Sequence, residues 1–159
     1  MPDNNNKLPP CGLYRTSVAL AANPELVPAG RLVMFHNHSD QNMPFVQLPE
    51  KNVNNIWKFT ENGPGIESPE FIEGLQPLLP QGIYYLKKGI KTHDEVQPAF
   101  SIVQLGYTPE AEPIIFMGSF ENGVIVFPQQ GYKFYDPSIF EHLQPLRTKG
   151  DIGGIVSFH

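Results

Sequence analysis

The chain has 159 residues, of which 40% are hydrophobic, and this apolar content is enough to form a folded core. Its 11 basic and 16 acidic side chains give a net charge of -5, which disfavours binding to the phosphate backbone of nucleic acids. The 17 prolines and 14 glycines exclude many long helices and favour a mostly β protein of short strands joined by tight turns.

The N-terminal residues 1–8 are polar and are expected to be disordered. They contain no apolar segment typical of a signal peptide, and no stretch of the chain approaches the length of a membrane span. Cys11 is the single cysteine, which excludes an internal disulfide and fits a reducing compartment. We therefore expect a cytoplasmic protein that does not insert into membranes.

The first half of the chain predicts short strands and one helical turn. A strand around residues 12–14 is followed by a proline-containing loop, a second strand at 31–37 and a polar turn, HSDQNM. A third strand begins near Pro44, and a fourth contains Trp57. The helical turn begins at Ser68, an N-cap residue followed by a proline, and a short final strand, QPL, closes the half.

The second half predicts the same order of elements. Its first strand lies around residues 82–84 and its second at 100–107, followed by the turn TPEAE. Asn122-Gly123 joins the next two strands, and this dipeptide favours a hairpin because it tolerates the positive φ of a type I′ turn. A helical turn then begins at Asp136, which is again followed by a proline and ends in QPL.

Two similar segments indicate an internal repeat. Residues 68–78 read SPEFIEGLQPL and residues 136–146 read DPSIFEHLQPL. Both begin with an N-cap residue and a proline, and both place apolar residues four apart on one helix face. Further matches precede them in the same order, including GLY with GIY and the pair at 56–57, IW, with the pair at 126–127, VF. The sequence therefore predicts a tandem duplication.

Five short strands with one helical turn before the last is an element order that resembles an SH3-like barrel. We therefore expect two tandem SH3-like small β-barrel modules, at residues 9–78 and 79–148, which pack together because each alone buries a marginal core. The alternative is one larger β-sandwich or barrel built from both halves. The C-terminal tail, residues 149–159, contains an apolar stretch and is a candidate to add a strand to an open sheet edge, in this molecule or a neighbour.

His36 and His38 form the most distinctive polar constellation. Their spacing resembles the opening of the cupin motif, in which two histidines one residue apart point the same way from a strand and bind a metal. The glutamate expected after them is missing from SDQNMPF, and the second half has Gly106 and Thr108 in place of the histidines. The sequence therefore predicts no metal site, and His36 and His38 remain the only candidates for one.

No catalytic or cofactor motif stands out. His93-Asp94-Glu95 places a base beside carboxylates, but adjacent residues on a strand face opposite sides of the sheet. Gly63-Pro64-Gly65 is not typical of a phosphate loop, because proline lacks a backbone donor and no lysine follows. We expect no enzymatic activity and no cofactor.

Aromatic residues, 11% of the chain, are the remaining signal. Most are expected to fill the cores, with Tyr85, Tyr132 and Tyr135 exposed. In SH3-like folds, exposed aromatics form grooves for proline-rich or cationic peptides. We therefore predict a non-enzymatic protein-binding module, an adaptor or structural subunit of a larger assembly, whose partners are other protein chains. The alternative is a cupin-like metal-binding protein or small enzyme that uses His36 and His38.

Overall fold

A computed structural model describes residues 8–93 and 95–146 of the chain. The described part is mostly β, as predicted, and its strands pair in several antiparallel sheets. No helix in these two ranges is long and apolar enough to cross a lipid bilayer. The predictions of a disordered start at residues 1–8 and of a strand added by the tail at residues 149–159 lie outside the described residues, except at Leu8.

The chain forms two compact units. Among the described residues, unit 1 contains residues 8–80 together with Gly106–Pro113, and unit 2 contains Gln81–Leu105 together with residues 114–146. The predicted second module, residues 79–148, therefore contains an eight-residue loop that belongs to unit 1, and we call Gly106–Pro113 the docked loop.

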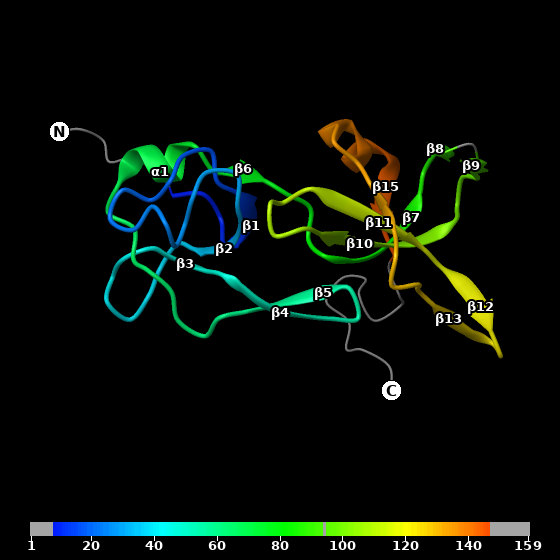
Figure 1. Ribbon diagram of the computed structural model, residues 1–159, viewed down its shortest axis with the longest axis horizontal. Helices are drawn as coiled ribbons and strands as arrows, with labels where there is room; N and C mark the ends of the chain where they lie inside the picture. Colours follow the sequence, from blue (N-terminus) through cyan, green and yellow to red (C-terminus); the bar gives the residue numbers. More distant parts are fainter. Residues whose placement is uncertain (1–7, 94, 147–159) are drawn as a thin grey trace. The chain divides into compact units, whose positions relative to one another are not determined.

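Unit 1 is built around a four-stranded antiparallel sheet of order β3-β2-β1-β6 (Figure 1). Its strands are β1 (Gly12–Arg15), β2 (Leu32–His36), β3 (Phe45–Gln47) and β6 (Gln76–Pro77). The remaining elements are a separate hairpin and a short helix, namely β4 (Pro49–Val53), β5 (Ile56–Phe59) and α1 (Pro69–Glu73).

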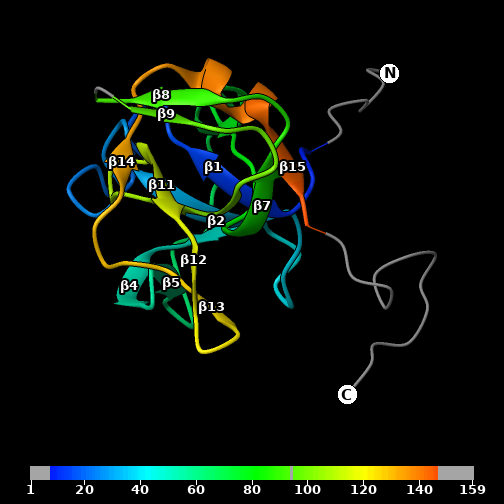
Figure 2. The same cartoon turned by 90° about the vertical axis from the view of Figure 1, so that its right-hand side faces the viewer.

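Unit 2 is built around a five-stranded antiparallel sheet of order β14-β11-β10-β7-β15. Its strands are β7 (Gly82–Leu86), β10 (Ile102–Tyr107), β11 (Pro113–Met117), β14 (Tyr132–Lys133) and β15 (Leu143–Pro145). Two hairpins and a 3₁₀ helix complete the unit (Figure 2), namely β8 (Ile90–Thr92) with β9 (Glu95–Gln97), β12 (Ser119–Glu121) with β13 (Val124–Val126), and η1 (Pro137–His142).

The two sheets agree in strand order and in register. The order β3-β2-β1-β6 in unit 1 corresponds to β11-β10-β7-β15 in unit 2. Tyr14 lies opposite Val33, and Tyr84 lies opposite Val103 at the same place in its sheet. On its other side each tyrosine lies opposite the proline of the last strand. Residues at matching register positions of the two units are called equivalent.

One face of each sheet carries the core. In unit 1, apolar side chains of the sheet pack with those of α1 and the loops, in a cluster of Tyr14, Leu20, Val27, Val33, Phe35, Val46, Ile66, Phe71 and Leu75. The equivalent tyrosines, Tyr14 and Tyr84, are both buried. Burial raises the pKa of both phenols, because the charged phenolate is poorly solvated there, and the nearby Cys11 adds to the rise in the pKa of Tyr14.

The predicted helical turns are confirmed at both positions. The Ser68 hydroxyl accepts a bond from the amide of Phe71 at 3.4 Å and caps α1. The Asp136 carboxylate accepts a bond from the amide of Ser138 at 2.9 Å and caps η1. A proline follows each cap, where its fixed φ suits the first helical turn and its missing amide costs nothing.

The predicted hairpin at Asn122-Gly123 is also confirmed, because these residues have φ of 54° and 80°. Asn54 and Asn55, with φ of 54° and 69°, form the equivalent turn of β4–β5. Two successive residues with positive φ match the right-handed twist of the flanking strands, and asparagine and glycine tolerate this conformation best.

One residue match of the predicted repeat does not agree with the positions of the two hairpin turns. Trp57 lies two residues after the turn of its hairpin, as Ile125 does in the other, so these two residues are equivalent. The predicted match of Trp57 with Phe127 is therefore wrong by two residues, because the loops of the two halves differ in length before these hairpins.

The predicted SH3-like barrels are not closed in the part of the chain that the structure describes, where both main sheets are open. The edge strands of unit 1 are short, with three residues in β3 and two in β6. Pro77 of β6 has no amide hydrogen to donate to a further strand. The β4–β5 hairpin forms a sheet of its own instead of continuing the main sheet. The mostly β class is confirmed, whereas barrel closure is not observed.

Candidate functional site

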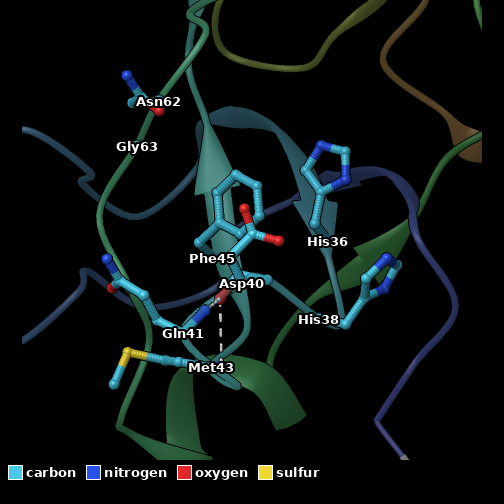
Figure 3. A pocket seen from close by; sticks show the side chains of 10 residues that line it. His36, His38, Asp40, Gln41, Met43, Phe45, Asn62 and Gly63 are labelled. Carbon is cyan, nitrogen blue, oxygen red and sulfur yellow. Dashed lines mark hydrogen bonds between the residues drawn. The ribbon is translucent and has the colours of Figure 1, made fainter.

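The two histidines of the cupin-like pattern line a pocket of about 560 Å³ in unit 1 (Figure 3). His36 is the last residue of β2, and His38 lies in the following turn. Asp40 and Phe45 also line this pocket, and Asn62 lines the opposite wall. Both histidines therefore lie at one cavity, whose lining mixes polar and apolar side chains.

Each histidine already contacts a neighbouring side chain. His36 Nε2 lies 2.6 Å from the amide oxygen of Gln47, and its ring stacks on Phe45 with centroids 4.7 Å apart. His38 Nδ1 lies 2.8 Å from the amide oxygen of Asn37. Among the described residues, no group of three or more histidine, cysteine or carboxylate side chains could hold a metal ion. The pocket therefore offers two histidine nitrogens without a third ligand from residues 8–93 and 95–146.

Gly63 and Gly65 form part of this pocket for a steric reason. A Cβ atom at Gly63 would overlap the carbonyl oxygen of Val46, and one at Gly65 would overlap the sulfur of Met43. The Gly-Pro-Gly segment therefore packs against β3 and shapes the pocket wall, which gives it a structural role.

Cys11 lies beside this pocket and contacts residues that the sequence did not connect to it. The amide of Asn37 donates to Cys11 Sγ at 3.3 Å, and His38 Nδ1 is 4.0 Å from the same sulfur. The thiol is exposed. Asn37 Oδ1 and the Cys11 thiol both lie near the same nitrogen of His38, Nδ1. In a catalytic triad one ring nitrogen contacts the nucleophile and the other contacts the orienting residue, so these three side chains do not have the geometry of a triad.

The three tyrosines predicted to bind partners lie in unit 2 and differ in exposure. Tyr85 is half-buried and stacks on Phe100, with ring centroids 6.2 Å apart. Tyr132 is half-buried and meets the ring of His93 edge-on at 5.2 Å. Tyr135 is 76% exposed, and Lys133 Nζ lies 5.9 Å from its ring centroid, within the range of a cation–π contact.

The structure does not gather these tyrosines on one surface. Tyr132 lies opposite Ile115, a fully buried residue, and therefore shares the core face of the sheet. Tyr85 lies opposite Ile102 on the other face, because neighbouring residues of a strand point to opposite sides and Tyr84 is in the core. Tyr85 and Tyr132 therefore belong to two different surfaces of unit 2.

A groove of about 330 Å³ lies on the same face as Tyr85 and was not predicted. Its apolar lining includes Phe100 and Phe120, which are 74% and 72% exposed. The full lining is Gln97, Phe100, Ser101, Ile102, Met117, Gly118, Ser119, Phe120 and Ile125. The one sequence signal for it was the Asn-Gly turn, which places Phe120 near the end of a hairpin.

Phe100 has an unusual backbone conformation. Its φ is 70°, in the left-handed region that large side chains avoid, and its amide donates to Leu86. The equivalent residue of unit 1 is Gly30, with φ of 73° and an amide that donates to Thr16. The fold requires positive φ at this position, glycine satisfies it without strain, and unit 2 retains an exposed phenylalanine there instead. A strained residue that adds no burial is typical of a functional position.

Comparison of the chain with protein-family models, curated proteins and solved structures finds no match.

Proposed function

We propose that this protein is a non-enzymatic protein-binding module, an adaptor or structural subunit of a larger assembly of protein chains. The observation that carries the proposal is the exposure of large aromatic side chains in unit 2, where Phe100, Phe120 and Tyr135 each expose more than two thirds of their area. Large exposed aromatic side chains mark interaction surfaces, since they gain much apolar contact when a partner covers them.

Tyr85 supports the same proposal from the sheet face. It stacks on Phe100 and thereby extends the apolar surface beyond the groove. Tyr135, with Lys133 beside its ring, offers a second contact area with a positive charge. Amphipathic aromatic side chains of this kind are enriched in protein interfaces.

We further propose that the two units arose by tandem duplication of one small β module. The matching strand order, the matching register and the two capped helical turns support this origin. A duplicated module presents two related surfaces, which allows one copy to change its surface while the other keeps the original packing.

Native size fractionation of cell lysate, followed by mass spectrometry of co-migrating chains, tests the proposal. We expect the chain to migrate in a complex larger than its own 17.8 kDa. We expect the variant Tyr135→Ala, which removes an exposed ring, to weaken this association without unfolding, and the control Val18→Ser, an exposed apolar position of unit 1, to leave it unchanged. Migration of the wild-type chain alone would contradict the proposal.

The metal-binding alternative depends on one observation, that His36 and His38 line the same pocket. Metal analysis of protein purified without chelators or a metal-binding tag decides it. A stoichiometric transition metal that is lost in the double variant His36→Ala/His38→Ala would favour it over the adaptor role.

A further inference from the structure

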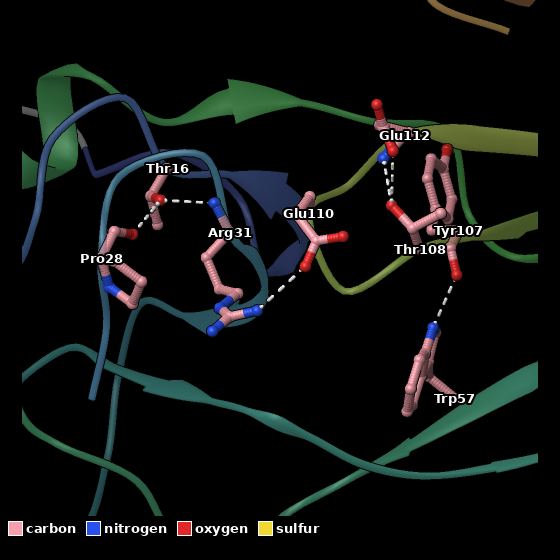
Figure 4. A network of polar contacts seen from close by, with 8 residues as sticks. All are labelled: Thr16, Pro28, Arg31, Trp57, Tyr107, Thr108, Glu110 and Glu112. Carbon is pink, nitrogen blue, oxygen red and sulfur yellow. Dashed lines mark hydrogen bonds and ion pairs between the residues drawn. The ribbon is translucent and has the colours of Figure 1, made fainter. Parts of the chain in front are cut away.

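The docked loop contacts β2, the residue that precedes it and the β4–β5 hairpin of unit 1 (Figure 4). The amide of Leu32 donates to the carbonyl of Pro109 at 2.8 Å, and the indole nitrogen of Trp57 donates to the carbonyl of Tyr107 at 2.7 Å. Arg31 forms an ion pair of 3.3 Å with Glu110. Leu32 is fully buried. Unit 1 therefore binds a proline-containing, acidic loop through two donors and one cation.

The equivalent residues of unit 2 line its groove. Leu32 lies opposite Arg15, and Ile102 lies opposite Tyr85 at the same register position. Leu32 is therefore equivalent to Ile102, and Arg31, which precedes Leu32, is equivalent to Ser101. Trp57 is equivalent to Ile125 because both lie two residues after the turn of their hairpin. Ser101, Ile102 and Ile125 all line the groove of unit 2. The groove of unit 2 is thus lined by the residues equivalent to Arg31, Leu32 and Trp57, which contact the docked loop in unit 1.

The groove of unit 2 is less polar than the surface of unit 1 that contacts the docked loop. Serine replaces the cation and isoleucine replaces the indole donor, while Phe100 and Phe120 add exposed rings. No charged side chain is found among the described residues that line the groove. An acidic loop would lose its ion pair here, whereas proline and aliphatic side chains would pack against the rings.

We propose that the groove of unit 2 binds an uncharged, proline-containing loop of a partner chain, in the way that unit 1 binds the docked loop. This inference rests on the proposed protein-binding function and names the kind of segment that the partner presents. Phe100 is the central contact, and its strained φ is maintained because its exposed ring binds the partner.

Titration of the full-length chain with two synthetic peptides, followed by amide NMR, tests the proposal. One peptide has the sequence of the docked loop, GYTPEAEP, and the other is its uncharged analogue, GYTPQAQP. We expect the uncharged peptide to shift the amides around Phe100, Ile102 and Phe120, and to bind at least tenfold more tightly than the acidic one.

Three variants sharpen the experiment. Phe100→Gly places the unit 1 residue in unit 2, and we expect it to abolish peptide binding without lowering the urea midpoint of unfolding. Ser101→Arg restores the cation of unit 1, and we expect it to reverse the preference in favour of GYTPEAEP. Val96→Ser changes a similarly exposed apolar residue outside the groove lining, and we expect it to bind like the wild type.

The outcomes separate this inference from the proposed function. Groove amides that do not shift with millimolar peptide, or shifts that persist in Phe100→Gly, would overturn the inference. If the chain then still migrates in a large complex that depends on Tyr135, the protein-binding function stands and uses another surface. If the peptide binds as expected while the chain migrates alone, the groove is a binding site and the assembly role fails.

Discussion

In unit 1 the amide of Leu32 donates to Pro109 of the docked loop, whereas the equivalent Ile102 of unit 2 lines an open groove. The core faces of the two sheets show no such contrast, since both place buried aliphatic and aromatic side chains at equivalent positions. The two units therefore share the character of their core faces and differ in the residues that contact the docked loop in unit 1 and line the groove in unit 2. This division is expected where one surface has become a contact within the chain and the other is available to a partner.

The largest effects are expected from equivalent core residues. Phe35 and Leu105 are both fully buried, each opposite the first glycine of its neighbouring strand. We expect Phe35→Ala to lower the free energy of unfolding by about 4 kcal/mol and Leu105→Ala by about 3 kcal/mol, because each leaves a cavity in a packed core. Urea unfolding of the full chain measures both. A loss below about 1 kcal/mol at either position would show that the two cores are not equivalent in energy.

An intermediate effect is expected at Trp57, which contacts the docked loop in unit 1 and is equivalent to the groove residue Ile125 of unit 2. Trp57→Ile introduces the unit 2 residue and removes the donor to Tyr107, and we expect a loss of about 2 kcal/mol in the free energy of unfolding. Trp57→Phe keeps a ring and removes the hydrogen bond, so it should cost about 1 kcal/mol. Chemical denaturation measures the free energy of unfolding of both variants, and thermal unfolding provides an independent comparison. Equal stability of wild type and Trp57→Ile would mean that this bond does not hold the docked loop.

The smallest effects are expected at the two helix caps. Ser68→Ala and Asp136→Ala each remove an acceptor for a backbone amide at the start of a helical turn, and each should lower the free energy of unfolding by about 1 kcal/mol. Asp136→Asn serves as the matched control, because asparagine is an equally good cap. If only one of the two alanine variants loses stability, the caps of the two units differ in importance despite their similar sequences.

Local signals in the sequence predicted the features whose cause is local. Ser68 and Asp136, each followed by a proline, begin helical turns because the cap and the fixed proline φ act within a few residues. Asn122-Gly123 forms its hairpin for the same reason. The β8–β9 hairpin was expected to be a loop, since its strands contain three residues each and lysine and glutamate obscure any alternation.

Features that depend on distant parts of the chain were not predictable in this way. The groove combines residues of β10, β11 and the β12–β13 hairpin, and nothing in the sequence near Phe100 indicates its positive φ. The contact of Cys11 with Asn37 likewise joins residues far apart in the sequence. The docked loop was assigned to the second module because sequence order suggests it, whereas its hydrogen bonds are made with Leu32, Trp57 and Leu79.

The discontinuity of unit 1 has a consequence for how the chain folds during translation. Its first part ends at Pro80, but its last part, Gly106–Pro113, leaves the ribosome only after Gln81–Leu105 has been synthesised. A nascent chain that ends at Pro80 lacks the carbonyl partners of the Leu32 amide and the Trp57 indole. Unit 1 therefore completes its fold late, and the order of synthesis couples its maturation to the emergence of the strands that begin unit 2.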